Sequence, residues 1–255
     1  MSDNQYSIRI KRGKLAMLHE ATTPYNEEQC YITITSKYIQ FSSLINQFLG
    51  FEHRINQAKY LDITNINAKK IKNMYLICSI DKLKKHLAPF SKPIGSESAK
   101  KSEENVLLDL EKNQIRFRQE FPQFIGDWIS IEANNEELWH RLPQMDDTLS
   151  FNGQHFYGVV NRMSSTGEST IEIISKNDNL YMKSDAGIEY LTNKPGHLIN
   201  ISLHLPRIQL KRACNLIKQY HTFRVQIENE YILLEGVDKD KDNNIKILIY
   251  KVAKS

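Results

Sequence analysis

A chain of 255 residues can bury one large core or two medium-sized ones, and its 40% hydrophobic and 25% charged residues argue against global disorder. The net charge of +4 does not by itself identify a nucleic-acid-binding protein, because scattered surface lysines give the same total. The three dispersed cysteines form no C-x-x-C pair, so we expect them to be buried and reduced rather than part of a disulfide framework or a zinc site. The N-terminus lacks the apolar segment of a signal peptide and no apolar run is long enough to span a membrane, so we expect an intracellular, soluble protein.

The first half of the sequence predicts short strands and two helices. The strands are predicted over residues 7–10, 31–35, 38–41, 59–64, 74–78, 106–110, 115–121 and 127–131. The first helix covers residues 14–21, and the second begins after Ser79, which stands at the N-cap position. Residues 48–51 contain an apolar cluster without clear periodicity, and we interpret them as a loop.

Residues 132–147 (EANNEELWHRLPQMDD) break this pattern. The stretch is acidic, holds Trp139 and Leu142 in a polar setting, and contains Pro143, which prevents simple continuation of a helix. This composition is typical of a connector between two halves of a protein. Trp139 fits an ordinary core position equally well.

The second half repeats the order of elements in the first half. Its strands are predicted over residues 148–151, 170–174, 180–183, 188–191, 198–203, 223–227, 231–237 and 245–252. Its helices cover residues 153–164 and a stretch that includes residues 210–217. A repeat near half the chain length indicates a duplicated domain rather than a solenoid. We therefore expect an N-terminal domain over residues 1–131, a connector over residues 132–147 and a C-terminal domain over residues 148–255.

Two of the predicted helices combine a buried stripe with a basic face. The helix after Ser79 places Lys82 and Lys85 away from its apolar stripe, and the last helix does the same with Lys211 and Lys218 without any acidic residue. Lys11, Arg12 and Lys14 surround the start of the first helix, where positive charge opposes the helix dipole and hints at another use.

The sequence contains no recognisable catalytic or metal-binding motif. G-x-G-x-x-G, G-x-x-x-x-G-K-[ST], G-x-S-x-G and H-E-x-x-H are all absent. The aspartate-rich turn of residues 238–244 begins like a calcium loop but lacks the glycine and the bidentate glutamate that such a loop needs. We therefore predict no enzyme, no cofactor and no metal. An α+β enzyme with dispersed catalytic carboxylates stays an alternative, as does a protein–protein adaptor.

The order of elements and several segments resemble the proliferating cell nuclear antigen (PCNA) family of DNA sliding clamps. NGQHFYGVVNRMSSTGESTIEIISKNDNLYMKS (residues 152–184) is similar to the third helix of the family and its following hairpin. DWISIEANNEELWHRLP (residues 127–143) resembles the strand that leads into the interdomain connector, and IYKVAKS (residues 249–255) resembles the final strand and tail. The resemblance covers nearly the whole chain.

The resemblance implies an α+β fold with two topologically similar DNA-clamp domains, helices on the inner face and antiparallel sheets on the outer face. Three copies would form a closed ring around double-stranded DNA without reading its sequence. The DNA-contacting residues implied in this chain are Lys11, Arg12, Lys14, Lys82, Lys85, Arg162, Lys211 and Lys218. Gly158 and Asn161 stand where the family usually has basic residues, which puts the strength of DNA contact by the third helix in doubt.

The family also binds partner proteins in an apolar pocket beneath the connector. Its residues here would be Leu49, Trp139, Leu142, Pro143, Ile232, Val252 and Ala253. The implied function is that of a DNA polymerase processivity factor that works with a clamp loader and other clamp-binding proteins, in the nucleus of a eukaryotic cell or at a site of viral DNA replication. A clamp-fold subunit of a checkpoint or viral late-transcription complex is the alternative.

Overall fold

The computed structural model describes residues 5–23, 29–35, 37–45, 49–56, 73–91, 104–111, 113–119, 124–134, 142–165, 167–193, 198–239 and 243–253. The chain forms two compact units: residues 1–43 with 53–139, and residues 44–52 with 140–255. The predicted strand over residues 59–64 lies outside the described residues. The predicted domain boundaries stay a prediction.

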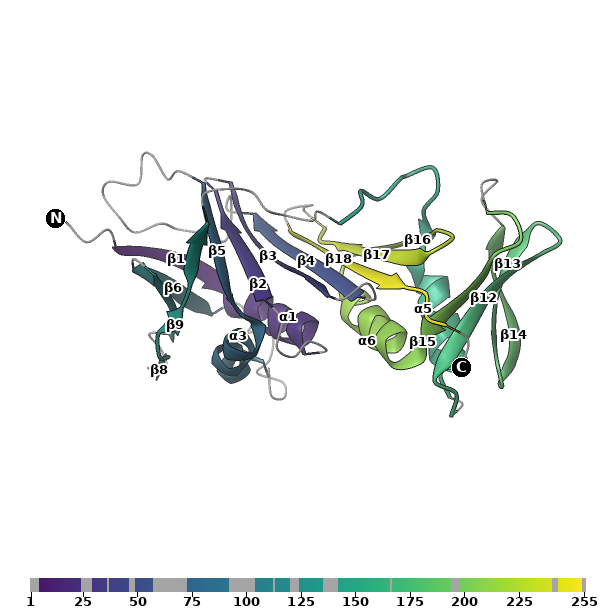
Figure 1. Ribbon diagram of the computed structural model, residues 1–255, viewed down its shortest axis with the longest axis horizontal. Coiled ribbons are helices and arrows are strands. Elements are labelled where there is room, and N and C mark those ends of the chain that lie inside the picture. The colour runs from purple at the N-terminus through teal and green to yellow at the C-terminus, as the bar shows by residue number, and fades with distance from the viewer. Residues whose placement is uncertain are drawn as a thin grey trace. The chain divides into compact units, whose positions relative to one another are not determined.

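The described residues of the first unit form two antiparallel sheets and two α-helices (Figure 1). Its elements are β1 (Gln5–Lys11), α1 (Arg12–Thr22), β2 (Gln29–Ile34), β3 (Tyr38–Ile45), β4 (Leu49–Asn56, which is divided between the units), β5 (Met74–Ser79), α3 (Ile80–Leu87), the 3₁₀ helix η2 (Ala88–Phe90), β6 (Asn105–Glu111), β7 (Gln114–Gln119), β8 (Phe124–Ile125), β9 (Ile129–Ser130) and β10 (Glu132–Asn134). One sheet has the order β1-β6-β7-β8, with β9 also paired to β7, and the other includes β10-β5-β2-β3. Helices α1 and α3 contact each other, and α3 packs on β2 and β5.

The second unit repeats this arrangement. Its elements are β11 (Phe151–Asn152), α5 (Gly153–Met163), β12 (Thr170–Lys176), β13 (Asn179–Ser184), β14 (Gly187–Asn193), β15 (Ser202–Pro206), α6 (Arg207–Ile217), β16 (Thr222–Ile227), β17 (Tyr231–Val237) and β18 (Asn243–Tyr250). One sheet has the order β14-β13-β12-β15, and the other includes β18-β17-β16-β11. Helices α5 and α6 contact each other, as α1 and α3 do.

The strand pairings show that the two units share one topology. β1 pairs with β6 as β11 pairs with β16, and β2 pairs with β3 and β5 as β12 pairs with β13 and β15. Helices α1 and α5 therefore occupy equivalent places in the two units, as do α3 and α6. The prediction of an α+β chain with two similar domains and antiparallel sheets is confirmed.

Local sequence signals explain the helices. In α3, Ile80, Leu83 and Leu87 are fully buried, and the Ser79 hydroxyl accepts a hydrogen bond from the Lys82 amide (3.4 Å), as predicted for an N-cap. In α5, Asn152 has the same capping role, accepting from the Gln154 amide at 2.8 Å. The apolar stripe of α6 is likewise buried.

A buried carboxylate joins three strands of the first unit. Asp109 on β6 is 1% exposed and accepts hydrogen bonds from Ser7 on β1 and from Arg116 and Arg118 on β7, at 2.7, 2.9 and 3.2 Å. Burial acts to raise the pKa of Asp109, but these three donors outweigh it and hold the pKa below its ordinary value of 3.8. The Arg116 guanidinium also lies over the Trp128 ring, 4.3 Å from its centroid.

Several predicted elements differ from the structure. The loop predicted around Leu49 and Phe51 is wrong, because Leu49–Asn56 forms the strand β4. Its alternation is hidden because Glu52 and His53 are buried together with the apolar Phe51. Of the strand predicted over residues 127–131, only β9 (Ile129–Ser130) forms. Of the strand predicted over residues 148–151, only Phe151 is in a strand, where it begins β11. Asp146 instead holds Thr148 in a turn, accepting from its amide (2.8 Å) and its hydroxyl (2.7 Å).

Candidate nucleic-acid interface and partner pocket

Helix α6 carries the cations that are best placed to meet a polyanion. Arg212 and Lys218 are exposed, Lys211 is half-buried, and the helix contains no acidic residue. Among the described residues, none of these three cations lies in an ion pair. Arg212 was not among the predicted DNA contacts, although it directly follows Lys211 in the sequence.

Lys218 is held in place by an aromatic residue of the neighbouring helix. Its ammonium donates a 2.7 Å hydrogen bond to the Tyr157 hydroxyl on α5 and lies 4.6 Å from the centre of the ring. Tyr157 could not be predicted as part of this site, because its contact with Lys218 joins residues that are 61 positions apart in the sequence. The contact leaves the charge of Lys218 uncompensated while restricting the side chain.

Helix α3 presents two lysines in a less favourable setting. Lys82 is exposed, and it lines a shallow hollow together with Gln29 of β2 and Glu132 of β10. Lys85 is 76% exposed, but its ammonium lies 3.4 Å from a carboxylate oxygen of Asp81, one turn earlier. Asp81 also contacts Lys84 at 3.6 Å. Such exposed pairs are weak, yet the carboxylate reduces the local positive potential.

The arginines at α1 and α5 are both paired with carboxylates, Arg12 largely covered and Arg162 with its side chain 58% exposed. The Arg12 guanidinium donates to Glu104 (3.2 Å), Gln119 (3.4 Å) and the Pro89 carbonyl (3.1 Å), and its side chain is 15% exposed. Arg162 forms a bidentate pair with Glu189 on β14. Lys11 and Lys14, on either side of Arg12, are half-buried. These four residues remain predicted DNA contacts, with Arg12 and Arg162 already bound to carboxylates.

Leu142, one of the residues predicted to form a partner pocket, belongs to an apolar cluster in the second unit. Leu142, 4% exposed, packs on Leu233 and Leu248, and the rings of Tyr231 and Tyr250 lie beside it with centroids 5.7 Å apart. Met145 is a further partly buried member. The cluster thus combines a buried centre with an incompletely covered aromatic rim. Its tyrosines were missed because only strand register places them opposite each other, Tyr231 against Tyr250.

The remaining predicted pocket residues differ in their placement. Ile232 is fully buried and alternates with Tyr231 and Leu233, so it points to the opposite face of β17 from the cluster. Pro143 is half-buried, Val252 donates its amide to the His204 carbonyl (2.8 Å), and Ala253 is exposed. Trp139 and the side chain of Leu49 lie outside the described residues.

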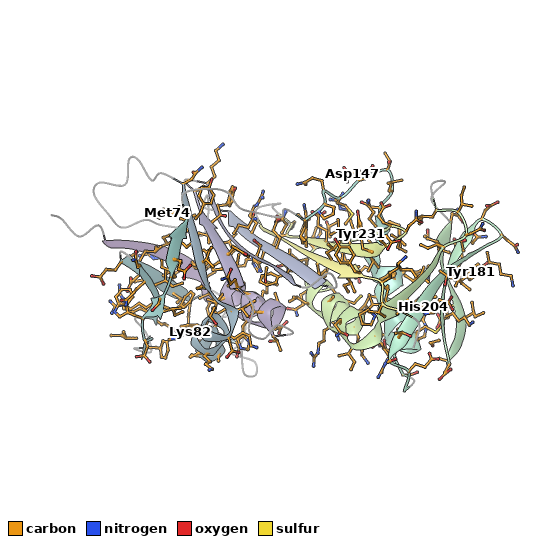
Figure 2. The ribbon with its side chains drawn as sticks, in the orientation of Figure 1. Met74, Lys82, Asp147, Tyr181, His204 and Tyr231 are labelled. Atoms are coloured by element: carbon orange, nitrogen blue, oxygen red, sulfur yellow. The ribbon has the colours of Figure 1, made fainter. Side chains whose placement is uncertain are left out.

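Polar contacts fix the segment after Leu142 onto the sheet. Gln144 accepts from the buried Lys246 ammonium (3.2 Å), and the Asp146 amide donates to Gln226 (2.7 Å). Arg224 on β16 then bridges Asp147 and the buried Glu235; Figure 2 shows Asp147 at the same side of the unit as Tyr231. Burial acts to lower the pKa of Arg224, but Glu235 and Asp147 raise it above its ordinary value.

The described part of the chain offers few reactive or metal-binding groups. Cys30, Cys78 and Cys214 are free and buried, as predicted, and burial raises the pKa of the Cys214 thiol. No group of three or more metal-ligating side chains is found among the described residues. Within the same residues, no helix combines the length and apolar character needed to cross a membrane.

Comparison with known proteins relates the fold to one group of structures. No protein-family model and no curated protein sequence matches the chain. PCNA from Entamoeba histolytica superposes with a TM-score of 0.65 at 11% identity, over 98% of this chain and 100% of that one. A. fulgidus PCNA, solved with the C-terminal region of FEN-1 bound, gives a TM-score of 0.66 at 10% identity, over 98% and 99%. Over nearly its whole length, this chain has the PCNA-like clamp fold.

Proposed function

We propose that this protein is a DNA sliding clamp: a ring that encircles duplex DNA without reading its sequence and tethers a DNA polymerase and other replication or repair proteins. The observation that carries the proposal is the acid-free helix α6 in a clamp fold, with Lys211, Arg212 and Lys218 outside any ion pair of the described residues. Phosphate contacts by such cations give sequence-independent attraction, which suits a protein that slides. The protein supplies no catalytic chemistry.

Ring closure is proposed to occur head to tail between three copies. β14 is an edge strand with β13 on one side, and it exposes Ile188 (58%) and Tyr190 (46%). The first unit offers a different edge, where the short strands β8 and β9 follow β7 and Ile125 is 55% exposed. Pairing β14 of one copy with this edge of the next copy would cover apolar side chains and remove both edges by a closing, heterologous interface.

Partner proteins are proposed to bind at the apolar cluster around Leu142. Tyr231 and Tyr250 provide amphipathic rings, and Leu142 and Leu248 a buried base, which together suit the apolar anchors of a short peptide. The bound FEN-1 segment in the A. fulgidus structure supports this class of partner. A clamp loader would open the ring.

The first experiment is light scattering on the purified chain after gel filtration. Because the chain has a mass of 29.8 kDa, a closed ring of three copies would weigh about 89 kDa. A monomer that forms larger species only with other chains would favour a subunit of a mixed clamp, such as a checkpoint or viral late-transcription complex. A trimer without salt-sensitive binding to duplex DNA would favour an adaptor with the clamp fold.

A further inference from the structure

The third helix of the clamp fold is joined to the edge of a sheet by two specific contacts. Arg162, in the last turn of α5, places its Nε 2.9 and 3.0 Å from the two carboxylate oxygens of Glu189 and its Nη2 2.5 Å from one of them. Two turns earlier on the same face of α5, the Nε2 of His155 lies 2.9 Å from the Tyr190 carbonyl oxygen. Glu189 and Tyr190 are consecutive residues of β14.

β14 needs such support because its own pairing is incomplete. It is hydrogen-bonded to β13 alone in its sheet. Its register also shifts: Tyr190 lies opposite Tyr181, whereas Thr192 lies opposite Leu180, which leaves Leu191 as an extra residue. A bulge of this kind bends a strand and interrupts its hydrogen bonds, and His155 binds the carbonyl directly before the bulge.

The outward side of the same strand is the one available to a second chain. Ile188 and Tyr190 are 58% and 46% exposed, whereas Leu191 is 2% exposed. Large apolar side chains on an unpaired edge strand favour aggregation in a monomer, whereas in an interface they are buried and stabilise it. The contacts from α5 engage the Glu189 carboxylate and the Tyr190 carbonyl, and they leave the Ile188 side chain exposed.

We propose that Arg162 and His155 are positioning residues that hold β14 in the geometry to which a second copy of this chain binds, and that Arg162 is not a phosphate contact. The inference rests on the proposed ring, in which β14 is one of the two paired edges. It assigns Arg162 a different partner from the one that the resemblance to sliding clamps implies.

The charge distribution around α5 favours this assignment. The carboxylate of Glu189 occupies the Nε and Nη2 donors of the guanidinium and offsets its positive charge beside the place where a phosphate would bind. The hydrogen bonds from Arg162 lower the pKa of Glu189, so this carboxylate stays ionised at neutral pH. Since α5 (GQHFYGVVNRM) has no other arginine or lysine, the helix offers DNA little net attraction.

A charge swap tests the proposal in the full-length chain. The variants are Arg162→Glu, Glu189→Arg and the two combined, with Lys251→Glu as a control that reverses another exposed, ion-paired cation of the same unit. Hydrogen exchange of the β14 amides, mass by light scattering at decreasing concentration, and the salt dependence of binding to duplex DNA are measured for each.

We expect each single reversal to speed exchange in β14 by about two- to fivefold or more, because it replaces an attractive pair with a repulsive one. Each should also shift the ring toward monomers. The combined variant should recover part of both losses, incompletely because a glutamate in the last turn of a helix opposes its dipole. Lys251→Glu should leave both properties unchanged.

The DNA measurement separates the two assignments of Arg162. If Arg162 contacts phosphate, its reversal lowers the salt slope by about one unit per contacting chain, and Glu189→Arg fails to restore it. That result, or unchanged exchange in β14 in all variants, would overturn the proposal. A wild-type chain that stays monomeric would refute the proposed ring instead, and the exchange data would still report whether the pair positions β14.

Discussion

The double variant Lys211→Ala/Lys218→Ala should weaken binding to duplex DNA and flatten its salt dependence more than any other pair of lysine substitutions in the second unit. Lys211 lies in the middle of α6 and Lys218 at its C-cap, and no described carboxylate compensates either charge. Each phosphate contact contributes about 0.9 to the slope of log affinity against log salt concentration. Losing two contacts should therefore lower the slope by about 1.8 for each copy that touches DNA.

The assay is fluorescence anisotropy of a labelled duplex over a fourfold range of salt. Across roughly 50 to 200 mM salt, one phosphate contact changes affinity about 3.5-fold, and two contacts change it about 12-fold. The wild-type protein should lose this much more affinity over the range than the double variant. The difference should be the same for duplexes of unrelated sequence, because phosphate contacts carry no base information.

A matched control distinguishes the effect of where the two lysines lie from the effect of losing two positive charges. Lys183→Ala/Lys251→Ala removes the same two charges from the same unit, but these lysines are paired with Glu172 (3.7 Å) and Glu230 (2.6 Å). The control should keep the wild-type slope. If it lowers the slope as much as the α6 variant does, or if the α6 variant keeps the wild-type slope, our assignment of α6 as a DNA contact is refuted.

Three further changes test the fold that positions these groups. Ser79→Ala removes the N-cap of α3 and should lower the free energy of unfolding by about 1 kcal/mol in a urea titration, whereas Ser79→Asn should retain most of it. Gly153→Ala would place a Cβ 2.3 Å from the Phe223 ring and should cost about 1–3 kcal/mol, whereas Gly167→Ala meets nothing within 4 Å and should change stability by less than about 0.5 kcal/mol. Because the folded-state pKa of Asp109 lies below its ordinary value of 3.8, its ionised form stabilises the protein above that pH, and this stability is lost as the pH falls through the lower folded-state value. In acid titrations followed by circular dichroism, Asp109→Asn should lack that loss, and a parallel pH profile for variant and wild type would contradict this account.

Elements with a strong local signal could be predicted from the sequence. In α3, the spacing of three apolar residues and the serine before them is sufficient, because a helix buries one stripe and needs a cap. The hairpin β12–β13 is equally local: Asn177 and Asp178 adopt positive φ angles of 50° and 58°, which asparagine and aspartate tolerate in a two-residue turn. Such features depend on residues a few positions apart.

Features that depend on distant partners could not be predicted. β4 carries Glu52 and His53 at buried positions, so its strand pattern is visible only when the surrounding structure is known. The aromatic rim around Leu142 requires the register of β17 and β18, which places Tyr231 opposite Tyr250. Helical spacing likewise predicts which face of a helix a cation occupies, but not whether a carboxylate from another element reaches it.

The predicted DNA contacts differ between the two helices of each unit in whether a carboxylate from another element binds them. The equivalent helices α1 and α5 carry Arg12 and Arg162, and each arginine is bound by a carboxylate far away in the sequence, Glu104 or Glu189. The other equivalent pair, α3 and α6, presents exposed lysines, of which Lys218 is outside any ion pair of the described residues. One helix in each unit thus uses its arginine to join strands and helices, and the other leaves lysines for a polyanion. The two arginines lie at opposite ends of their helices, Arg12 in the first turn of α1 and Arg162 in the last turn of α5, so the two units share this division of charge without sharing the positions that carry it.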